Sequence, residues 1–206
     1  MYQIGLIGRK LGMTQIFTNT GIMIPITLIE IPPCTIVQKK LSNLNGYNAI
    51  QLGCFNIKNN KISKPLLGYF AKYNIKPVKY LKEFKLQNIQ NFFIGQILSL
   101  KNIDENKKLQ IEGITIGKGN AGNIKRNNFK RGPMTHGSKH HRLQGSLGAG
   151  TTPSRVFPGK KMAGRLGNSH CSIKGLSIVY ININNNILFV KGSVPGKSGS
   201  ILHILQ

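Results

Sequence analysis

Short runs of alternating apolar and polar residues, separated by turn-forming residues, fill the first quarter of the chain and return toward its C-terminus. Runs of this length at intervals of about 8–12 residues are typical of β-barrels and β-sandwiches. The alternation predicts strands at residues 2–8, 12–17, 22–31, 35–39, 49–55, 109–116, 177–183, 187–191 and 201–205. We therefore predict a mainly β fold.

Residues 56–108 interrupt this pattern and predict a small peripheral α+β part. Residues 64–73 place Leu66 and Phe70 at helical spacing, which indicates a short helix. Residues 76–85 interleave lysines with apolar residues, as an exposed strand does. Those lysines either protect a sheet edge from pairing or face RNA, and the sequence leaves both interpretations open.

Residues 117–168 show neither helical nor strand periodicity. The stretch from Lys118 to Asn168 contains no Asp or Glu, and glycine and proline recur throughout it. Its eleven basic residues are Lys118, Lys125, Arg126, Lys130, Arg131, Lys139, Arg142, Arg155, Lys160, Lys161 and Arg165. Ordering each residue costs roughly 1–2 kcal/mol of backbone entropy, which this composition cannot offset by apolar burial. The stretch therefore needs a large polyanionic partner, and nucleic acid fits best.

The strands on either side of this stretch predict one β domain, formed by residues 1–116 and 169–206. Residues 117–168 would then be an insertion whose two ends lie close together and which projects as a long arm. We call residues 117–168 the basic arm.

The charge of the chain supports a polyanionic partner. Twenty-nine Lys and Arg against five Asp and Glu give a net charge of +24, and every acid lies in the first 112 residues. A soluble protein with this imbalance is expected to bind nucleic acid or an anionic membrane. We expect no membrane segment and no signal or transit peptide, so the protein would work in the compartment where it is made.

Metal and disulfide chemistry find little support. The three cysteines have no paired spacing, which predicts reduced thiols in a reducing compartment rather than a zinc site. His136, His140 and His141 stand together in the basic arm, but no carboxylate is near in sequence and neighbouring cations would repel a metal ion. We expect no metal, and we interpret these histidines as stacking on bases and hydrogen-bonding to phosphates.

A dinucleotide fingerprint is also present in form. Residues 117–122 read GKGNAG directly after a predicted strand, but the following residues do not begin an apolar-faced helix. No acid exists downstream to hold a ribose hydroxyl. The glycines would rather let backbone amides approach phosphates.

Phe129 and Phe157 lie among cations, which suits stacking on nucleic-acid bases. Each could instead pack where the arm joins the β domain.

Several long motifs in unchanged order carry a resemblance to one family. They are IGLIGRKLGMTQIF (4–17), GKGNAG (117–122), FKRGPMTHGSKHHR (129–142), GSLGAGTTP (145–153), GKKMAGRLG (159–167) and VKGSVPG (190–196). In these motifs the chain resembles the ribosomal protein L3 family of bacterial and organellar type. Residues 56–108 are the least distinctive part.

The resemblance implies a fold, a function and a set of partners. The fold would be a translation-protein-type β-barrel whose arm runs through large-subunit rRNA toward the peptidyl transferase centre. Family members bind this rRNA near its 3′ end, act early in assembly and contact the L14 and L19 protein families. They are structural proteins, so no enzymatic activity, cofactor, small-molecule substrate or membrane is expected. The arm tip would comprise Gln144, Ser146, Thr151, Thr152 and Pro153.

Two details of the motifs refine this expectation. Some bacterial relatives carry a methylated glutamine at the tip where Thr151 stands here, so we do not expect that modification. The sequence starts at the family's own N-terminus, and GAGTTP at 148–153 resembles plastid and cyanobacterial versions. We expect a plastid ribosome, with a bacterial cytoplasm as the alternative.

Two other classes of function compete with a structural ribosomal protein. An enzyme with a nucleotide cofactor would need the missing downstream acid. A nonspecific basic protein would carry a lysine-rich, low-complexity tail, whereas the arm mixes Arg, His, Gly and aromatic residues without repetition.

Overall fold

A computed structural model describes residues 5–86 and 89–206 of the chain. Contacts divide the chain into two units, one reaching up to Ile114 and resuming at His170, the other formed by Thr115–Ser169. We call the first the β unit and the second the basic unit. No helix in the part that the structure describes is long and apolar enough to cross a membrane.

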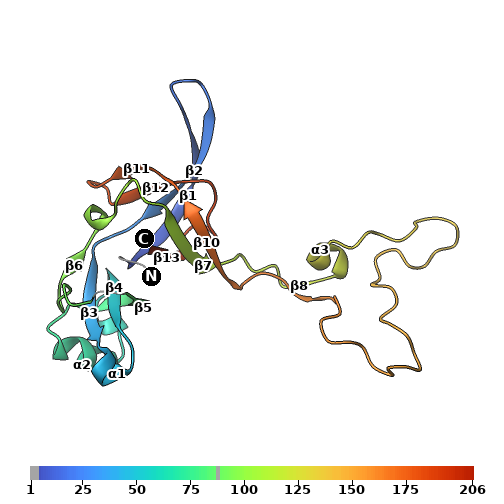
Figure 1. Ribbon diagram of the computed structural model, residues 1–206, viewed down its shortest axis with the longest axis horizontal. Helices are drawn as coiled ribbons and strands as arrows, with labels where there is room; N and C mark the ends of the chain where they lie inside the picture. The colour runs from blue at the N-terminus through green and yellow to red at the C-terminus, as the bar shows by residue number, and fades with distance from the viewer. Residues whose placement is uncertain (1–4, 87–88) are drawn as a thin grey trace. The chain divides into compact units, whose positions relative to one another are not determined.

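Two antiparallel sheets build the β unit (Figure 1). The larger, in the order β10-β7-β13-β1-β2-β12-β11, consists of β1 (Gly5–Phe17), β2 (Met23–Glu30), β7 (Leu109–Ile114), β10 (His170–Leu176), β11 (Ile178–Asn182), β12 (Ile187–Lys191) and β13 (Ile201–Leu205). The smaller, in the order β5-β4-β3-β6, consists of β3 (Cys34–Lys40), β4 (Ala49–Asn56), β5 (Val78–Lys85) and β6 (Ile97–Leu98). The short helical elements of the β unit are α1 (Ser42–Asn45), η1 (Asn59–Lys61), α2 (Lys64–Lys72) and η2 (Leu100–Asn102).

The predicted mainly β class is confirmed. The strands expected at 2–8 and 12–17 are one strand, β1, with an irregularity between Lys10 and Gly12; residues 2–4 lie outside the described residues. The expected helix is α2, and the lysine-rich strand is β5, at an edge of the smaller sheet.

Closure into a barrel, in contrast, was wrongly expected, because the sheets are not closed. The larger sheet ends at β10 on one side and β11 on the other. These edge strands are consecutive, with only Ser177 between Leu176 and Ile178. Because of this short link, β10 and β11 follow each other end to end. Hydrogen bonding between them, which would close the barrel, would require the two strands to lie side by side. The sheet curls so that one stretch of chain supplies both of its edges.

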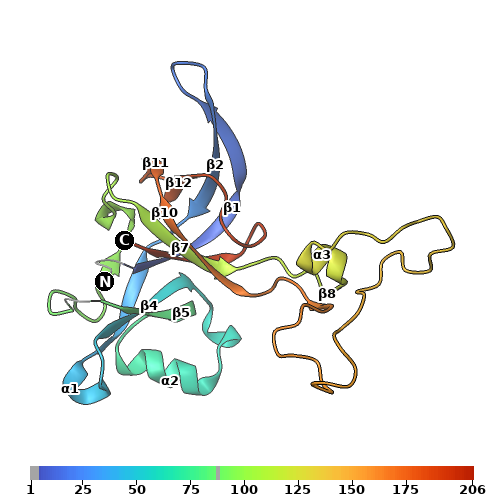
Figure 2. The ribbon, with the colours of Figure 1, turned by 45° about the vertical axis from the view of Figure 1, so that its right-hand side comes forward.

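Apolar residues from both sheets share one core. Leu6 and Ile29 of the larger sheet and Ile36 and Ile50 of the smaller one are fully buried in the same cluster. Buried Phe70 of α2 packs with Val37 and Val78 of the smaller sheet in a second cluster. Figure 2 shows α2 beside the strands of this sheet. Alternation along β12 buries Leu188 and Val190, as the sequence pattern predicts, whereas the first half of β1 and most of β4 bury consecutive residues.

A buried lysine holds a loop against β1. Lys10 is 8% exposed, and its Nζ donates to the carbonyl oxygens of Val194 and Gly196, both at 2.9 Å. Burial lowers the pKa of Lys10 from its usual value. Because a buried charge is costly without partners, these two bonds tie the loop between β12 and β13 to the sheet.

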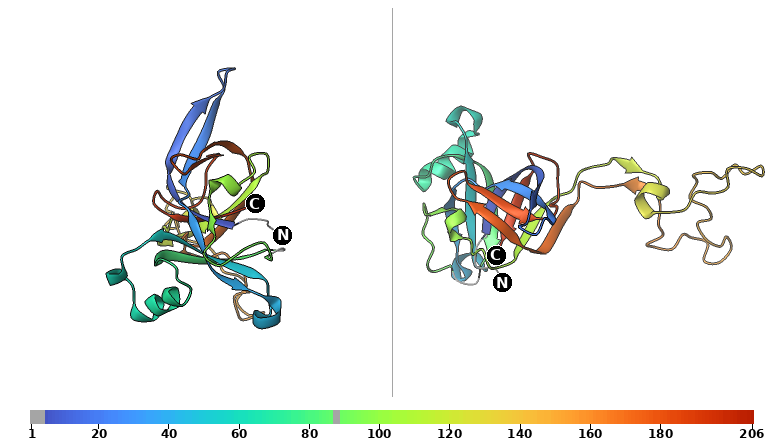
Figure 3. Two further views of the ribbon diagram at one scale, coloured as in Figure 1. Left: turned by 90° about the vertical axis from the view of Figure 1, so that its left-hand side faces the viewer. Right: turned by 90° about the horizontal axis from the view of Figure 1, so that it is seen from above.

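The outer part of the β1–β2 hairpin extends beyond the other strands of the larger sheet (Figure 3). It contains no charged residue between Lys10 and Glu30, and its exposed side chains include Phe17 and Ile22. Backbone hydrogen bonds between β1 and β2 therefore maintain this part of the hairpin, with little apolar packing to support them.

Candidate nucleic-acid interface

Backbone hydrogen bonds close the base of the basic unit. The Thr115 nitrogen donates to the Ser169 oxygen at 3.0 Å, and further along β8 (Asn120–Ala121) pairs with β9 (Gly164–Arg165). Between these points Gly167 has φ +72°, and a Cβ there would lie 2.0 Å from the carbonyl oxygen of Ile116. Only glycine fits that position, because any side chain would collide with the Ile116 backbone. The glycine therefore lets the two chain segments approach closely there.

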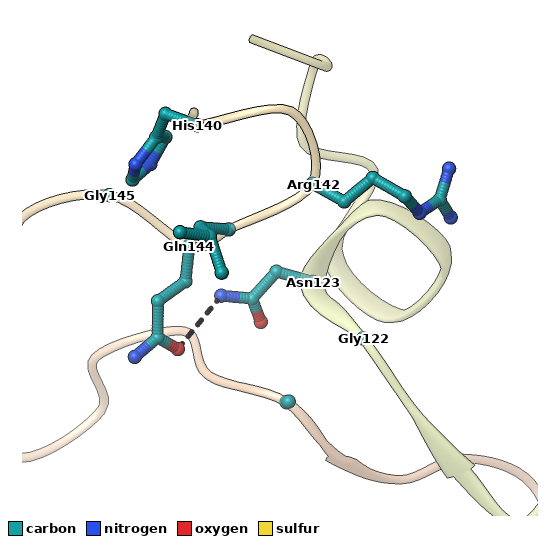
Figure 4. A pocket seen from close by; sticks show the side chains of 8 residues that line it. Gly122, Asn123, His140, Arg142, Gln144 and Gly145 are labelled. Carbon is teal, nitrogen blue, oxygen red and sulfur yellow. Dashed lines mark hydrogen bonds between the residues drawn. The ribbon is translucent and has the colours of Figure 1, made fainter. Parts of the chain in front are cut away.

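A short helix, α3 (Asn123–Asn127), follows the GKGNAG motif and is held by polar contacts. Buried Asn123 donates from Nδ2 to Gln144 Oε1 at 3.3 Å and accepts from Asn127 Nδ2 at 2.8 Å (Figure 4). Asn127 Nδ2 and Arg126 Nη1 both donate to the Met162 oxygen, at 3.1 and 2.8 Å. These bonds connect α3 to two distant stretches of the unit. Sequence pattern did not predict this helix, because its residues form no apolar face.

The histidine-rich stretch forms a closed loop. The Gly132 nitrogen donates to the His141 oxygen at 3.1 Å, and His141 Nδ1 lies 2.9 Å from the Pro133 oxygen. A Cβ on Gly132 would lie 2.0 Å from the His140 oxygen, so this crossing also requires glycine. His136 and His140 are exposed.

All of the predicted cations of the basic unit are exposed, as are most of its other residues. Only Ala121 and Asn123 are buried in this unit, so it has no apolar core. Phe157 is 60% exposed, whereas Phe129 is half-buried and its backbone nitrogen donates to the Asn123 oxygen. The sequence contains no acid after residue 112 to balance the charge.

Two hollows lie within the basic unit. One, of about 430 Å³, is lined by Asn123, His140, Arg142 and Gln144 among others (Figure 4). The other, of about 230 Å³, is lined by residues 147–150 and 154–156, Arg155 among them.

Of the five residues predicted for the arm tip, only Gln144 lines one of these two hollows. Gln144 lies in the first hollow beside α3. Ser146 Oγ bonds with the backbone of Gly148. Thr151 and Thr152 are exposed, and Pro153 is half-buried.

The geometry defines a class of protein, in which a small β domain carries a long cationic segment that lacks a core of its own. Comparison with known families is specific: the model of the family described as ribosomal protein L3 matches residues 82–184. The chain belongs to the ribosomal protein L3 family. Members of this family are proteins of the large ribosomal subunit and function in translation.

Individual relatives align over nearly the whole chain. Large ribosomal subunit protein uL3c of Gracilaria tenuistipitata is 49% identical over 204 residues, covering 99% of this chain and 100% of the relative. The uL3c protein of Phaeodactylum tricornutum is 50% identical, with 98% of each covered. The uL3 protein of Synechococcus elongatus is 48% identical, covering 98% of this chain and 94% of the relative. Each of these relatives is named as a protein of the large ribosomal subunit.

Proposed function

We propose that the basic unit binds large-subunit rRNA directly and that the chain thereby supports assembly of the subunit. The observation that carries this proposal is the coexistence of eleven exposed cations with a single buried apolar residue, Ala121. A segment with this composition gains order only from an external polyanion. Folded rRNA is a polyanion of defined shape.

Each type of side chain has a role in this proposal. The eleven cations neutralise phosphates, and Phe129, His136, His140 and His141 add stacking and hydrogen bonds to bases. Exposed Phe157 provides a further aromatic face. The hollow beside His140 and Arg142 is roomy enough for an unstacked base. Glycines at close crossings allow RNA helices to lie near the backbone.

Position within the subunit is the finer part of the proposal. The motifs at 129–142 and 145–153 support binding near the 3′ end of the rRNA early in assembly. They also support an arm reaching toward the peptidyl transferase centre, with Ser146 and residues 151–153 at its tip. Proteins of the L14 and L19 families are the proposed neighbours.

We also propose that the ribosome is that of a plastid. The support is that several relatives carry the plastid name uL3c. A bacterial cytoplasm is the alternative, because bacterial uL3 proteins are equally similar.

The experiment is crosslinking of the tagged chain in its native cells, followed by sequencing of the bound RNA. A matched strain carries Lys160→Ala and Lys161→Ala. A dominant footprint on large-subunit rRNA near the 3′ end, reduced in the matched strain, is the expected result. Diffuse recovery of many RNAs would make the chain a general basic binder, and recovery of none would overturn the proposal.

A further inference from the structure

Three potential metal ligands meet on the larger sheet of the β unit. Glu112 lies on β7, His170 on β10 and His203 on β13, which are neighbouring strands in the order β10-β7-β13. One ligand atom from each lies within 4.8 Å of the others.

The register of the sheet explains this meeting. Glu112 lies directly opposite His203 in the β7–β13 ladder and directly opposite Ser172 in the β10–β7 ladder. His170 precedes Ser172 by two positions, so it projects from the same face. Side chains directly or diagonally opposite on one face of a sheet are within reach of each other. The sheet therefore fixes the spacing of the three groups.

Hydrogen bonds within the protein do not use all of the ligand atoms in this cluster. Gln110 Nε2 donates to Glu112 Oε1 at 3.1 Å, which orients the carboxylate, while Glu112 Oε2 lies 3.9 Å from His170 Nε2. That distance is too long for a hydrogen bond. In the part of the chain that the structure describes, His203 Nδ1 is a buried atom with no hydrogen-bond partner. Phe84 covers the His203 ring edge-on, with 6.2 Å between ring centres.

Although the sequence alone predicted no metal, we propose that Glu112, His170 and His203 bind one divalent transition-metal ion, with Zn²⁺ as the best match. Two imidazoles and one carboxylate are a common zinc set, with water in the fourth position. Mg²⁺ and Ca²⁺ prefer ligand sets made of oxygen atoms, so they fit less well. His170 has a side chain that is 56% exposed, which gives an ion and its water a route from solvent.

The location of this site indicates a structural role. β10 is an edge strand, and His170 is both its first residue and the first residue after the basic unit. A metal ion would crosslink β10 to β7 and β13 at that end.

Lys82 repels positive charge at His203, so it should weaken binding of the metal ion.

The test uses the full-length chain, stripped with a chelator and then desalted. Zn²⁺ is titrated by calorimetry, Co²⁺ is titrated by visible absorption, and thermal unfolding is followed with and without Zn²⁺. We expect one equivalent of each metal, a Co²⁺ spectrum of four- or five-coordinate nitrogen and oxygen ligation, and a higher Tm with Zn²⁺.

Variants assign the ligands. His170→Ala and Glu112→Gln should each reduce affinity at least about tenfold and remove the Zn²⁺-dependent rise in Tm. His170→Ala changes an exposed residue, so it tests the site even where His203→Ala fails to fold. Lys82→Gln should increase affinity.

The control is His140→Ala, which removes an exposed histidine of the basic unit and should leave binding unchanged. The proposal is overturned by failure of the wild-type chain to bind one equivalent. It is equally overturned if His140→Ala loses the metal while His170→Ala and Glu112→Gln retain it.

Discussion

Asn123 and Gln144, 21 positions apart, are joined by a 3.3 Å hydrogen bond within the basic unit. Asn123 is 3% exposed and is the only buried polar residue of that unit. Side-chain amides, and not apolar packing, therefore hold α3 against the stretch that follows the histidine-rich loop.

Breaking this hydrogen bond should weaken RNA binding, because the RNA must then order more of the chain. Asn123→Ala and Gln144→Ala should each reduce affinity for a large-subunit rRNA fragment by about 2- to 10-fold, the equivalent of one ordinary hydrogen bond. The double variant should lose less than the sum of the two single losses. Strict additivity would show that the two amides act independently in the bound state.

Gly132→Ala should disturb the histidine-rich loop, because the new Cβ would lie 2.0 Å from the His140 oxygen. We expect weaker rRNA binding with an unchanged Tm of the β unit, measured by filter binding and circular dichroism. Gly68→Ala, in α2 of the β unit, is the control, since its Cβ would meet nothing within 4 Å. Equal losses in both variants would contradict a role for this close crossing.

Replacing Lys160 and Lys161 with alanine should weaken rRNA binding and flatten its dependence on salt. The slope of log affinity against log salt should fall by up to about one unit for each phosphate that the variant no longer neutralises. Lys58 and Lys61, exposed residues of the β unit, provide a control with the same loss of charge. An unchanged slope in the Lys160/Lys161 variant would place those two lysines in solvent.

The Lys40–Glu83 pair should make stability depend on pH. Lys40 Nζ lies 2.6 Å from Glu83 Oε1, and its hydrogen bond lowers the pKa of Glu83, with Tyr47 adding a smaller effect. A carboxyl whose pKa is lowered by folding stabilises the protein above the unfolded pKa, near 4.5, and this contribution disappears as pH falls through the folded value.

Glu83→Gln should accordingly be less stable than wild type at pH 7, and the difference should shrink at pH 3. Urea unfolding at both pH values measures it. Glu105→Gln, which removes an exposed acid, is the control. A difference that stays constant with pH would show that the ion pair contributes nothing through Glu83 ionisation.

Local pattern was enough to predict several of these elements. Residues 187–191 alternate cleanly and form β12, residues 109–116 contain the shorter β7 (Leu109–Ile114), and Leu66 with Phe70 indicated α2. In such segments the hydrophobic period and the tertiary structure agree.

The remaining features depend on contacts between distant residues. β10 was not predicted, because Lys174 and Gly175 break its alternation and pairing with β7 maintains it. The Glu112–His170–His203 cluster depends on the register of three strands that no local spacing reveals. Closure of the barrel was wrongly expected, because no local pattern shows that the two edge strands, β10 and β11, follow each other at Ser177. That arrangement depends on the pairing of all the strands in the sheet.

The position of β13 has a consequence for the time at which the protein can fold. This strand comes last in the chain, yet it lies between β1 and β7 in the larger sheet. During synthesis β1 and β7 must therefore wait for residues 201–205 before they gain this shared neighbour. The basic unit is complete in the nascent chain before then, so its cations are available to RNA while the sheet is still unfinished. Capture by RNA can thus precede folding of the β unit, and the order of the strands along the chain makes that sequence of events the natural one.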